Sequence, residues 1–202
     1  MNSTLKWLIP VGIIAVVLFS IYGTVVGFNN TAITLQQDSK TAWGNVESSY
    51  QRRNDLIGNL VQTVQGAANF EKGTLTAVIE ARAKATAVTI DPSKVTPDQL
   101  EAFQKSQTGV SSALSRLMVS VERYPDLKAN ENFLRLQAEL EGTENRIKIA
   151  RDRYNESVNP YNKHILSFPN SIFAGWFGFK ELPYYKSDAG AEKAPTVKFD
   201  FK

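Results

Sequence analysis

An apolar run near the start of the chain limits the possible folds more than any other feature. Residues 7–28 read WLIPVGIIAVVLFSIYGTVVGF, and no charged side chain lies between Lys6 and Asp38. A helix needs about 20 apolar residues to cross a bilayer, so this run is long enough to span one with some tilt. The sequence therefore predicts a transmembrane helix over residues 7–28 that contacts membrane lipid and follows a short N-terminal flank, residues 1–6.

Two other interpretations of this run are a cleaved signal peptide and a buried helix of a soluble domain. Against a signal peptide, the run exceeds the usual apolar region of about 7–15 residues, and no clean A-x-A site follows it. The flanking charges bear on orientation: the N-terminus and Lys6 precede the run, and the first basic residue after it is Lys40. The positive-inside rule then favours an exported body, by a margin of one or two charges.

The composition excludes several kinds of chemistry. The 202 residues include no cysteine and one histidine, which rules out a thiol nucleophile, a zinc ribbon, an iron–sulfur site and a di-iron helical bundle. The sequence contains no P-loop, nucleophile elbow or dinucleotide fingerprint. A net charge of +3 is too small to indicate nucleic acid as a partner. We therefore expect no enzymatic activity, cofactor, metal ion or small-molecule substrate.

The middle of the chain has the three- and four-residue spacing of amphipathic helices. We predict a first helix over residues 31–87, weakened by glycines and kinked near residues 69–73. A second helix follows over residues 96–124, and its apolar seam has one polar interruption, at Gln107. A third begins near residue 129 and carries the most regular stripe, with Pro160 expected to kink it or open one turn.

Three amphipathic helices must bury their stripes against one another. The sequence therefore predicts an all-α fold, in which the transmembrane helix precedes an up-down antiparallel bundle of three long helices and a short fourth C-terminal helix. The bundle domain would cover residues 30–185. Residues 186–202 would form a flexible or extended tail, whose last residues alternate like an edge strand. The same seams could also pair between chains, so a homo-oligomer is an open alternative.

One group of polar residues lies close to the apolar stripes. Arg53 and Asn59 lie near the stripe of the first helix, where a polar group is costly unless it is paired. Glu141, Glu144 and Asn145 lie beside the stripe of the third helix and are the obvious partners. We predict a buried network that fixes the register of these helices, with an anionic-ligand site or a solvated face as alternatives. The network predicts that Arg53→Ala and Glu141→Ala each lower the melting temperature.

The segment YPDLKAN joins the second and third predicted helices. Tyr124 precedes Pro125 and is disfavoured in helical geometry, so the second helix should stop there. Asp126 and Leu127 would continue the turn, and Asn130 can cap the third helix. We predict an inter-helix turn, with a partner-recognition loop as the alternative.

The segment IFAGWFGF changes the character of the chain near its C-terminal end. Its large apolar side chains are Ile172, Phe173, Trp176, Phe177 and Phe179. We predict a short helix that closes the open end of the bundle. The alternative is an interfacial segment that touches the membrane, although the segment has few basic residues nearby.

Three stretches carry a family resemblance. They are AWGNVESSYQRRNDLIGNLVQTVQGAANFEKGTL at residues 42–75, YPDLKANENFLRLQAELEGTENRIKIARDRYNESVNPYN at 124–162, and FPNSIFAGWFGFKELPYY at 168–185. Together with the N-terminal span, they resemble the LemA family of bacterial membrane proteins. The resemblance implies a single-pass protein of the bacterial inner membrane with a helical-bundle domain, and it implies no reaction. Pro160 departs from the uninterrupted helix expected there.

Two non-enzymatic functions fit these observations. The first is a membrane-anchored helical scaffold that self-associates at the cell envelope. The second is an adaptor or sensor module that binds an unidentified partner protein through the bundle surface. The long seams and the weak site chemistry favour the scaffold.

Overall fold

The computed structural model describes residues 3–66 and 70–186, and it is built from helices. In chain order they are α1 (Ser3–Gln65), α2 (Lys72–Thr86), α3 (Pro97–Val121), α4 (Pro125–Lys128), α5 (Glu131–Leu166) and α6 (Asn170–Phe177). The described residues include no strand, so the all-helical prediction is confirmed. The predicted tail, apart from its first residue Lys186, lies outside the described residues.

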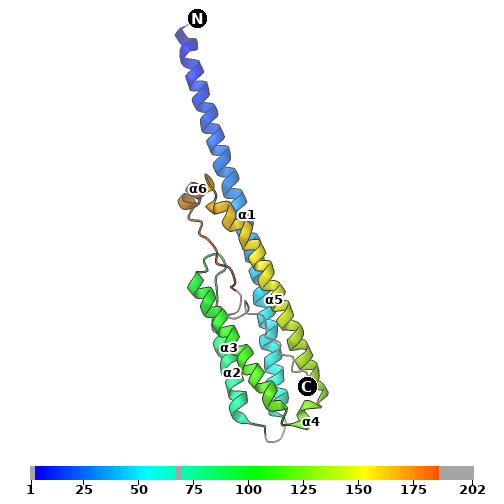
Figure 1. Cartoon of the computed structure of the whole chain (residues 1–202). Helices are drawn as coiled ribbons and strands as arrows, with labels where there is room; N and C mark the ends of the chain where they lie inside the picture. The colour runs from blue at the N-terminus through cyan, green and yellow to red at the C-terminus, as the bar shows by residue number, and fades with distance from the viewer. Residues whose placement is uncertain (1–2, 67–69, 187–202) are drawn as a thin grey trace, which may run out of the picture.

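Helix α1 continues without a break from the apolar run into the helical body. Among the described residues it is the one helix long and apolar enough to cross a membrane, and its most apolar 18-residue window has a mean hydropathy of 2.3 and is 6% buried. Its first strongly buried side chain is Phe28, which is 4% exposed. Figure 1 shows the first part of α1 extending alone beyond the other helices. The separate helices predicted over residues 7–28 and from residue 31 are therefore one element.

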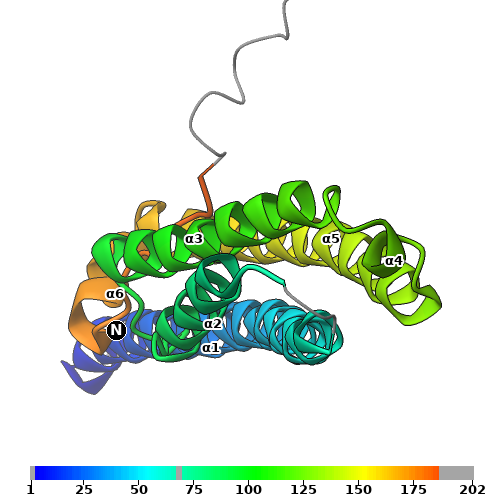
Figure 2. The same ribbon diagram turned by 90° about the horizontal axis from the view of Figure 1, so that it is seen from below.

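The body consists of α1, α2, α3 and α5 lying side by side. In Figure 1, α1 and α3 run away from the end that carries α6, whereas α2 and α5 run back towards it. Helix α4 lies at the opposite end, and Figure 2 shows the body along its length from below. We call the end with α6, from which α1 extends, the anchor end, and the end with α4 the far end.

The prediction of one helix over residues 31–87 is wrong. Helix α1 ends at Gln65, and α2 begins at Lys72 and returns along the body. The described residues on either side of this break include Gly66 and Gly73, and glycine is the residue that weakens helices most after proline. The reversal lets the apolar residues Leu75 and Val78 of α2 be buried in the core. The body therefore has four principal helices instead of three.

Helix α3 begins where the capping residues of the sequence predict. Thr96 caps α3, with its Oγ1 accepting from Gln99 N at 3.3 Å while Gln99 Oε1 accepts from Thr96 N at 3.0 Å. This capping box confirms the predicted start of the second helix.

Helix α5 continues through Pro160 as far as Leu166. Proline at this position therefore does not end the helix.

The buried apolar side chains form two clusters. The anchor-end core contains Phe28, Ala32, Trp43, Val46, Tyr50, Phe103, Ile147, Tyr154, Val158, Tyr161, Leu182 and Tyr185, among others. The far-end core contains Leu56, Ile57, Leu60, Val64, Val78, Val110, Leu114, Leu117, Leu127, Phe133 and Leu140, among others. Between the two clusters along α1 lies a buried polar residue, Arg53.

Candidate functional site

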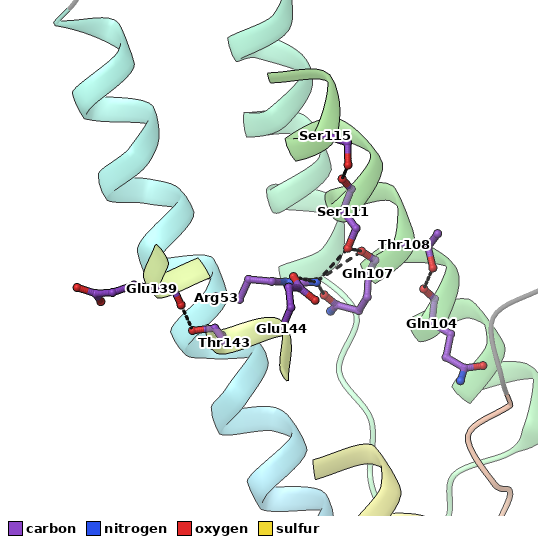
Figure 3. Close-up of polar contacts among 9 residues, drawn as sticks. All are labelled: Arg53, Gln104, Gln107, Thr108, Ser111, Ser115, Glu139, Thr143 and Glu144. Carbon is purple, nitrogen blue, oxygen red and sulfur yellow. Dashed lines mark hydrogen bonds and ion pairs between the residues drawn. The ribbon is translucent and has the colours of Figure 1, made fainter. Parts of the chain in front are cut away.

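Arg53 is the centre of a polar layer inside the body. Its Nη1 donates to Glu144 Oε1 at 3.0 Å and to Ser111 Oγ at 3.3 Å, and its Nη2 donates to Gln107 Oε1. The Arg53 guanidinium carbon lies 4.9 Å from the centre of the Tyr50 ring. Figure 3 shows Glu144, Gln107 and Ser111 directed at the guanidinium. Arg53 is 2% exposed, so these contacts take the place of water at Nη1 and Nη2, whereas its Nε is buried without a hydrogen-bond partner.

The polar layer joins three helices at one level. Arg53 lies three residues after Tyr50 of the anchor-end core and four before Ile57 of the far-end core. Gln107 occupies the same place on α3, between Phe103 and Val110. A helical register shift would move Arg53 into an apolar cluster, where an unpaired charge costs several kcal/mol, on the order of 3–5 kcal/mol. This arrangement disfavours displaced packings of α1 on α3.

The structure brings together two of the five residues predicted for this network, Arg53 and Glu144. Asn59, Glu141 and Asn145 are exposed, and the predicted contacts of these three residues are absent from the structure. Glu141 Oε1 instead accepts from Gln137 Nε2 of its own helix at 3.3 Å. The prediction was wrong for these three residues. A residue that is next to an apolar stripe in the sequence can still direct its side chain towards solvent.

Two polar residues of the layer were missing from the predicted network, Gln107 and Ser111 of α3. Gln107 is buried, and Ser111 lies one helical turn later. The sequence signal for Gln107 was the polar interruption of the second apolar seam. A buried glutamine in such a seam needs a polar partner from a neighbouring helix.

The polar layer is arranged for packing, and the described residues show no site for a metal ion. Within them, no group of three or more His, Asp or Glu side chains lies together. The guanidinium of Arg53 already donates to three side chains, and Glu144 is turned partly to solvent, with a side chain that is 46% exposed. The geometry therefore supports a register-fixing role for the layer.

The YPDLKAN segment forms the turn at the far end. Residues Pro125–Lys128 are the one-turn helix α4, which buries Leu127 and leaves Asp126 exposed. Tyr124 packs on Phe70, with ring centres 4.8 Å apart. Asn130 caps α5, and its Oδ1 accepts from the backbone N–H groups of the second and third helical residues at 3.0 and 3.1 Å.

Replacing this cap is expected to destabilise the body slightly. Asn130→Ala removes the acceptor for two backbone N–H groups and should lower the free energy of unfolding by about 1 kcal/mol. Urea titration followed by circular dichroism measures this. Asn132→Ala, two residues further on at an exposed helical position, is the matched control and should change stability little. Equal effects of the two variants would contradict the capping role.

At the anchor end, α6 packs against the point where α1 enters the body. The Phe28 ring lies 5.0 Å from the His164 ring, 5.7 Å from Phe173, 6.3 Å from Phe177 and 5.9 Å from Phe179, between ring centres. His164 also hydrogen-bonds Phe28 O at 3.1 Å through Nε2. These contacts fix α6 and the end of α5 to α1.

Of the five residues predicted for this segment, three are exposed and two are partly buried. Phe173 and Phe179 are partly buried against the anchor-end core, as a helix closing the bundle requires. Ile172, Trp176 and Phe177 are exposed. A helix that only closes the end of the bundle does not explain why these large apolar side chains face solvent.

A further element, residues 179–186, was not predicted, and we call it the C-terminal strap. Asn162 of α5 accepts from Leu182 N at 2.9 Å and donates to Leu182 O at 2.8 Å. Asn155, seven residues earlier, makes the same pair with Tyr185, at 2.8 and 3.1 Å. Two asparagines one heptad apart thus bind an extended segment as a neighbouring strand would. The available signal in the sequence was their spacing on the third predicted helix, where each asparagine directly follows a tyrosine of the apolar stripe.

The strap places Tyr185 in an aromatic cluster with Trp43 and Tyr154. The Tyr185 ring lies 5.9 Å from Trp43 and 5.7 Å from Tyr154, between ring centres. Burial raises the pKa of Tyr154 and of Tyr185 well above the ordinary value of 10.0. The neutral phenols are therefore strongly preferred in the folded state.

These pKa shifts predict a loss of stability at high pH. Below about pH 10 the tyrosines are neutral in both states, and above it they ionise in the unfolded chain first, which favours unfolding. Tyr185→Phe should weaken this pH dependence and change stability little at neutral pH, because Tyr185 Oη lacks a hydrogen-bond partner in the structure. Urea titrations over a series of alkaline pH values measure both effects. An unchanged pH dependence in Tyr185→Phe would contradict the prediction.

Over residues 3–66 and 70–186, fold and site together define a helical protein with one helix long and apolar enough to span a membrane, and with a body of packed helices. The chain belongs to the LemA family, whose model matches residues 42–199. The resemblance seen in the sequence is thereby confirmed.

Named relatives agree with this assignment. The chain is 27% identical to magnetosome protein MamQ 2 of Paramagnetospirillum magneticum over 89% of its own length and 71% of that protein. It is also 27% identical to magnetosome protein MamQ of Magnetospirillum gryphiswaldense, over 77% and 64% of the two chains. Protein LemA of Metamycoplasma hominis is 27% identical over 83% of this chain and 76% of its own. These matches agree with membership of the LemA family.

Proposed function

We propose that this protein is a non-catalytic scaffold of the bacterial inner membrane, anchored by α1 and self-associating, with its body on the exported side. The observation that carries the proposal is the continuity of α1. The helix that is apolar and exposed before Phe28 becomes, after Phe28, the longest helix of the body.

Continuity of α1 has a mechanical consequence. A flexible linker between the membrane-spanning segment and the body would let the body reorient freely. A continuous helix, which rises 1.5 Å per residue, instead fixes the distance and the direction of the body relative to that segment. Ala32, Trp43 and Val46 are buried in the anchor-end core, so α1 cannot rotate without disrupting the body. A scaffold needs this property, because the spacing of its subunits must be defined relative to the membrane surface.

Self-association is tested in native membranes with the full chain. Because the chain has no cysteine, single cysteines placed in turn at residues 17–27 report their own contacts by disulfide crosslinking. A specific helix contact should give a crosslinking efficiency that repeats every three to four residues. Uniformly low crosslinking, together with a specific co-purifying protein, would overturn the scaffold and favour the adaptor alternative.

Orientation is tested with one exposed position at the far end. In Asp126→Cys, the thiol should react with a membrane-impermeant maleimide in intact spheroplasts if the body is exported. Labelling only after lysis would place the body in the cytoplasm.

A further inference from the structure

We infer that the exposed apolar side of α6 is a membrane-interface contact, inserted among lipid headgroups and upper acyl chains beside the point where α1 leaves the body. We call this surface the α6 outer face; it consists of the exposed side chains of Ile172 and Trp176 in α6 and of Phe168 in the turn before it. This inference rests on the proposed membrane anchoring by α1. It assigns the outer face to lipid instead of to a protein partner.

The exposure of the α6 outer face is the first observation. Phe168 is 83% exposed and Trp176 is 75% exposed, and Ile172 lies one helical turn before Trp176 on the same side of α6. The opposite side of α6 carries Phe173 and Ala174, which pack into the anchor-end core. A short helix with large apolar side chains on both sides needs a second apolar environment.

The position of α6 identifies that environment. Phe28, the first strongly buried side chain of α1, is in contact with Phe173 and Phe177. At 1.5 Å per residue, the exposed part of α1 from Trp7 to the residue before Phe28 is about 30 Å long, the thickness of the hydrocarbon core. When that part spans the bilayer, the membrane boundary lies at Phe28. Helix α6 lies beside α1 at this level (Figure 1), which puts the α6 outer face at the depth of the headgroups.

The chemistry of the α6 outer face suits this depth. Tryptophan and phenylalanine are enriched where the apolar interior meets the headgroups. Lys163 and Lys180 are exposed close to α6 in sequence, and Glu181 is exposed beside them. The local charge is therefore small, and insertion depends on apolar area more than on anionic lipid. The contact of α6 with Phe28, where the exposed apolar part of α1 ends, favours lipid over a protein partner, whose surface would have to avoid the bilayer.

The three tryptophans of the chain provide the test, using full-length protein in phosphatidylcholine vesicles with nitroxide-labelled lipids. Trp43 is buried in the anchor-end core, so its emission should be unaffected by lipid nitroxides. In Trp7→Phe, Trp176 is the one reporter at the membrane, and a shallow nitroxide should quench it more than a deep one. In Trp176→Phe, Trp7 reports insertion of α1. Trp7→Phe/Trp176→Phe, with Trp43 alone, measures the background.

Each outcome decides the inference. Quenching of Trp176 above the Trp43 background supports it, and quenching of Trp7 alone overturns it while leaving the anchoring by α1 intact. Quenching of Trp176 without Trp7 supports the α6 contact and overturns the transmembrane anchor. Absence of quenching at both overturns both proposals. Circular dichroism of each variant shows that the fold is retained.

A second variant pair separates lipid contact from folding. Ile172→Ser changes the α6 outer face but leaves Trp176 as reporter, and in the Trp7→Phe background it should reduce the shallow quenching of Trp176. Leu134→Ser changes an exposed leucine near the far end and is the matched control, with no effect on quenching expected. Equal quenching in both variants would overturn the inference.

Discussion

Arg53→Ala is expected to lower the free energy of unfolding by about 3 kcal/mol, because it leaves the buried side chain of Gln107 without its partner and removes the ion pair with Glu144. Gln107 is buried and its Oε1 accepts from Arg53, and Ser111 also accepts from it. The Arg53 side chain packs on the Tyr50 ring as well, so its removal opens a space between the two cores. Thermal and urea unfolding measure the loss.

The neighbouring arginine is the matched control. Arg52 pairs with Glu139 at 3.3 Å, but both side chains are substantially exposed. Such surface pairs contribute about 0–1 kcal/mol, so Arg52→Ala should change stability little. If Arg52→Ala and Arg53→Ala destabilise the body equally, the polar layer has no special role.

The structure also changes what is expected of the two glutamates. The sequence alone predicts that Glu141→Ala lowers the melting temperature, but Glu141 is exposed and accepts from Gln137 of its own helix instead of from Arg53. Its replacement is now expected to be nearly neutral. Glu144→Ala should cost less than Arg53→Ala, because solvent reaches Glu144 and already weakens the ion pair.

The sequence predicted the local features of this fold better than its long-range features. Periodicity and capping residues indicated the helices from Thr96 onwards, because these signals act within a few residues. The break between α1 and α2 was predicted as a kink, since glycines near residues 66–73 weaken a helix without specifying a reversal. The reversal depends on burying Leu75 and Val78 against another helix, which periodicity does not encode.

The same distinction holds for the candidate sites. Arg53 could be selected from sequence because a charged residue interrupts an apolar stripe. Its partners could not all be selected, because several polar residues flank the stripe of α5 and rotation about the helix axis decides which one points inwards. Gln107 was visible as an interruption of its own apolar seam. Its pairing with Arg53 could not be predicted, because it depends on how far α1 and α3 are shifted relative to each other along their axes. The strap depends on contacts between segments about 20–30 residues apart, beyond any local pattern.

Asn162→Ala is expected to release the C-terminal strap and to lower the free energy of unfolding by about 3 kcal/mol. Asn162 is buried, and its amide satisfies both the N–H and the C=O of Leu182. Alanine leaves two buried backbone groups unpaired, each costing about 1–3 kcal/mol unless the strap detaches and is hydrated. Urea unfolding measures the stability, and hydrogen exchange at residues 180–186 measures the release.

Release of the strap would be visible at Trp43. The Tyr185 ring stacks on Trp43, so detachment should admit water, shift the Trp43 emission to the red and increase its quenching by acrylamide. These spectra are measured in a Trp7→Phe/Trp176→Phe background. Asn159→Ala, at an exposed position three residues earlier on α5, is the matched control. Slow exchange of residues 180–186 in Asn162→Ala would show that the apolar contacts of Leu182 and Tyr185, and not the paired amide, hold the strap against α5.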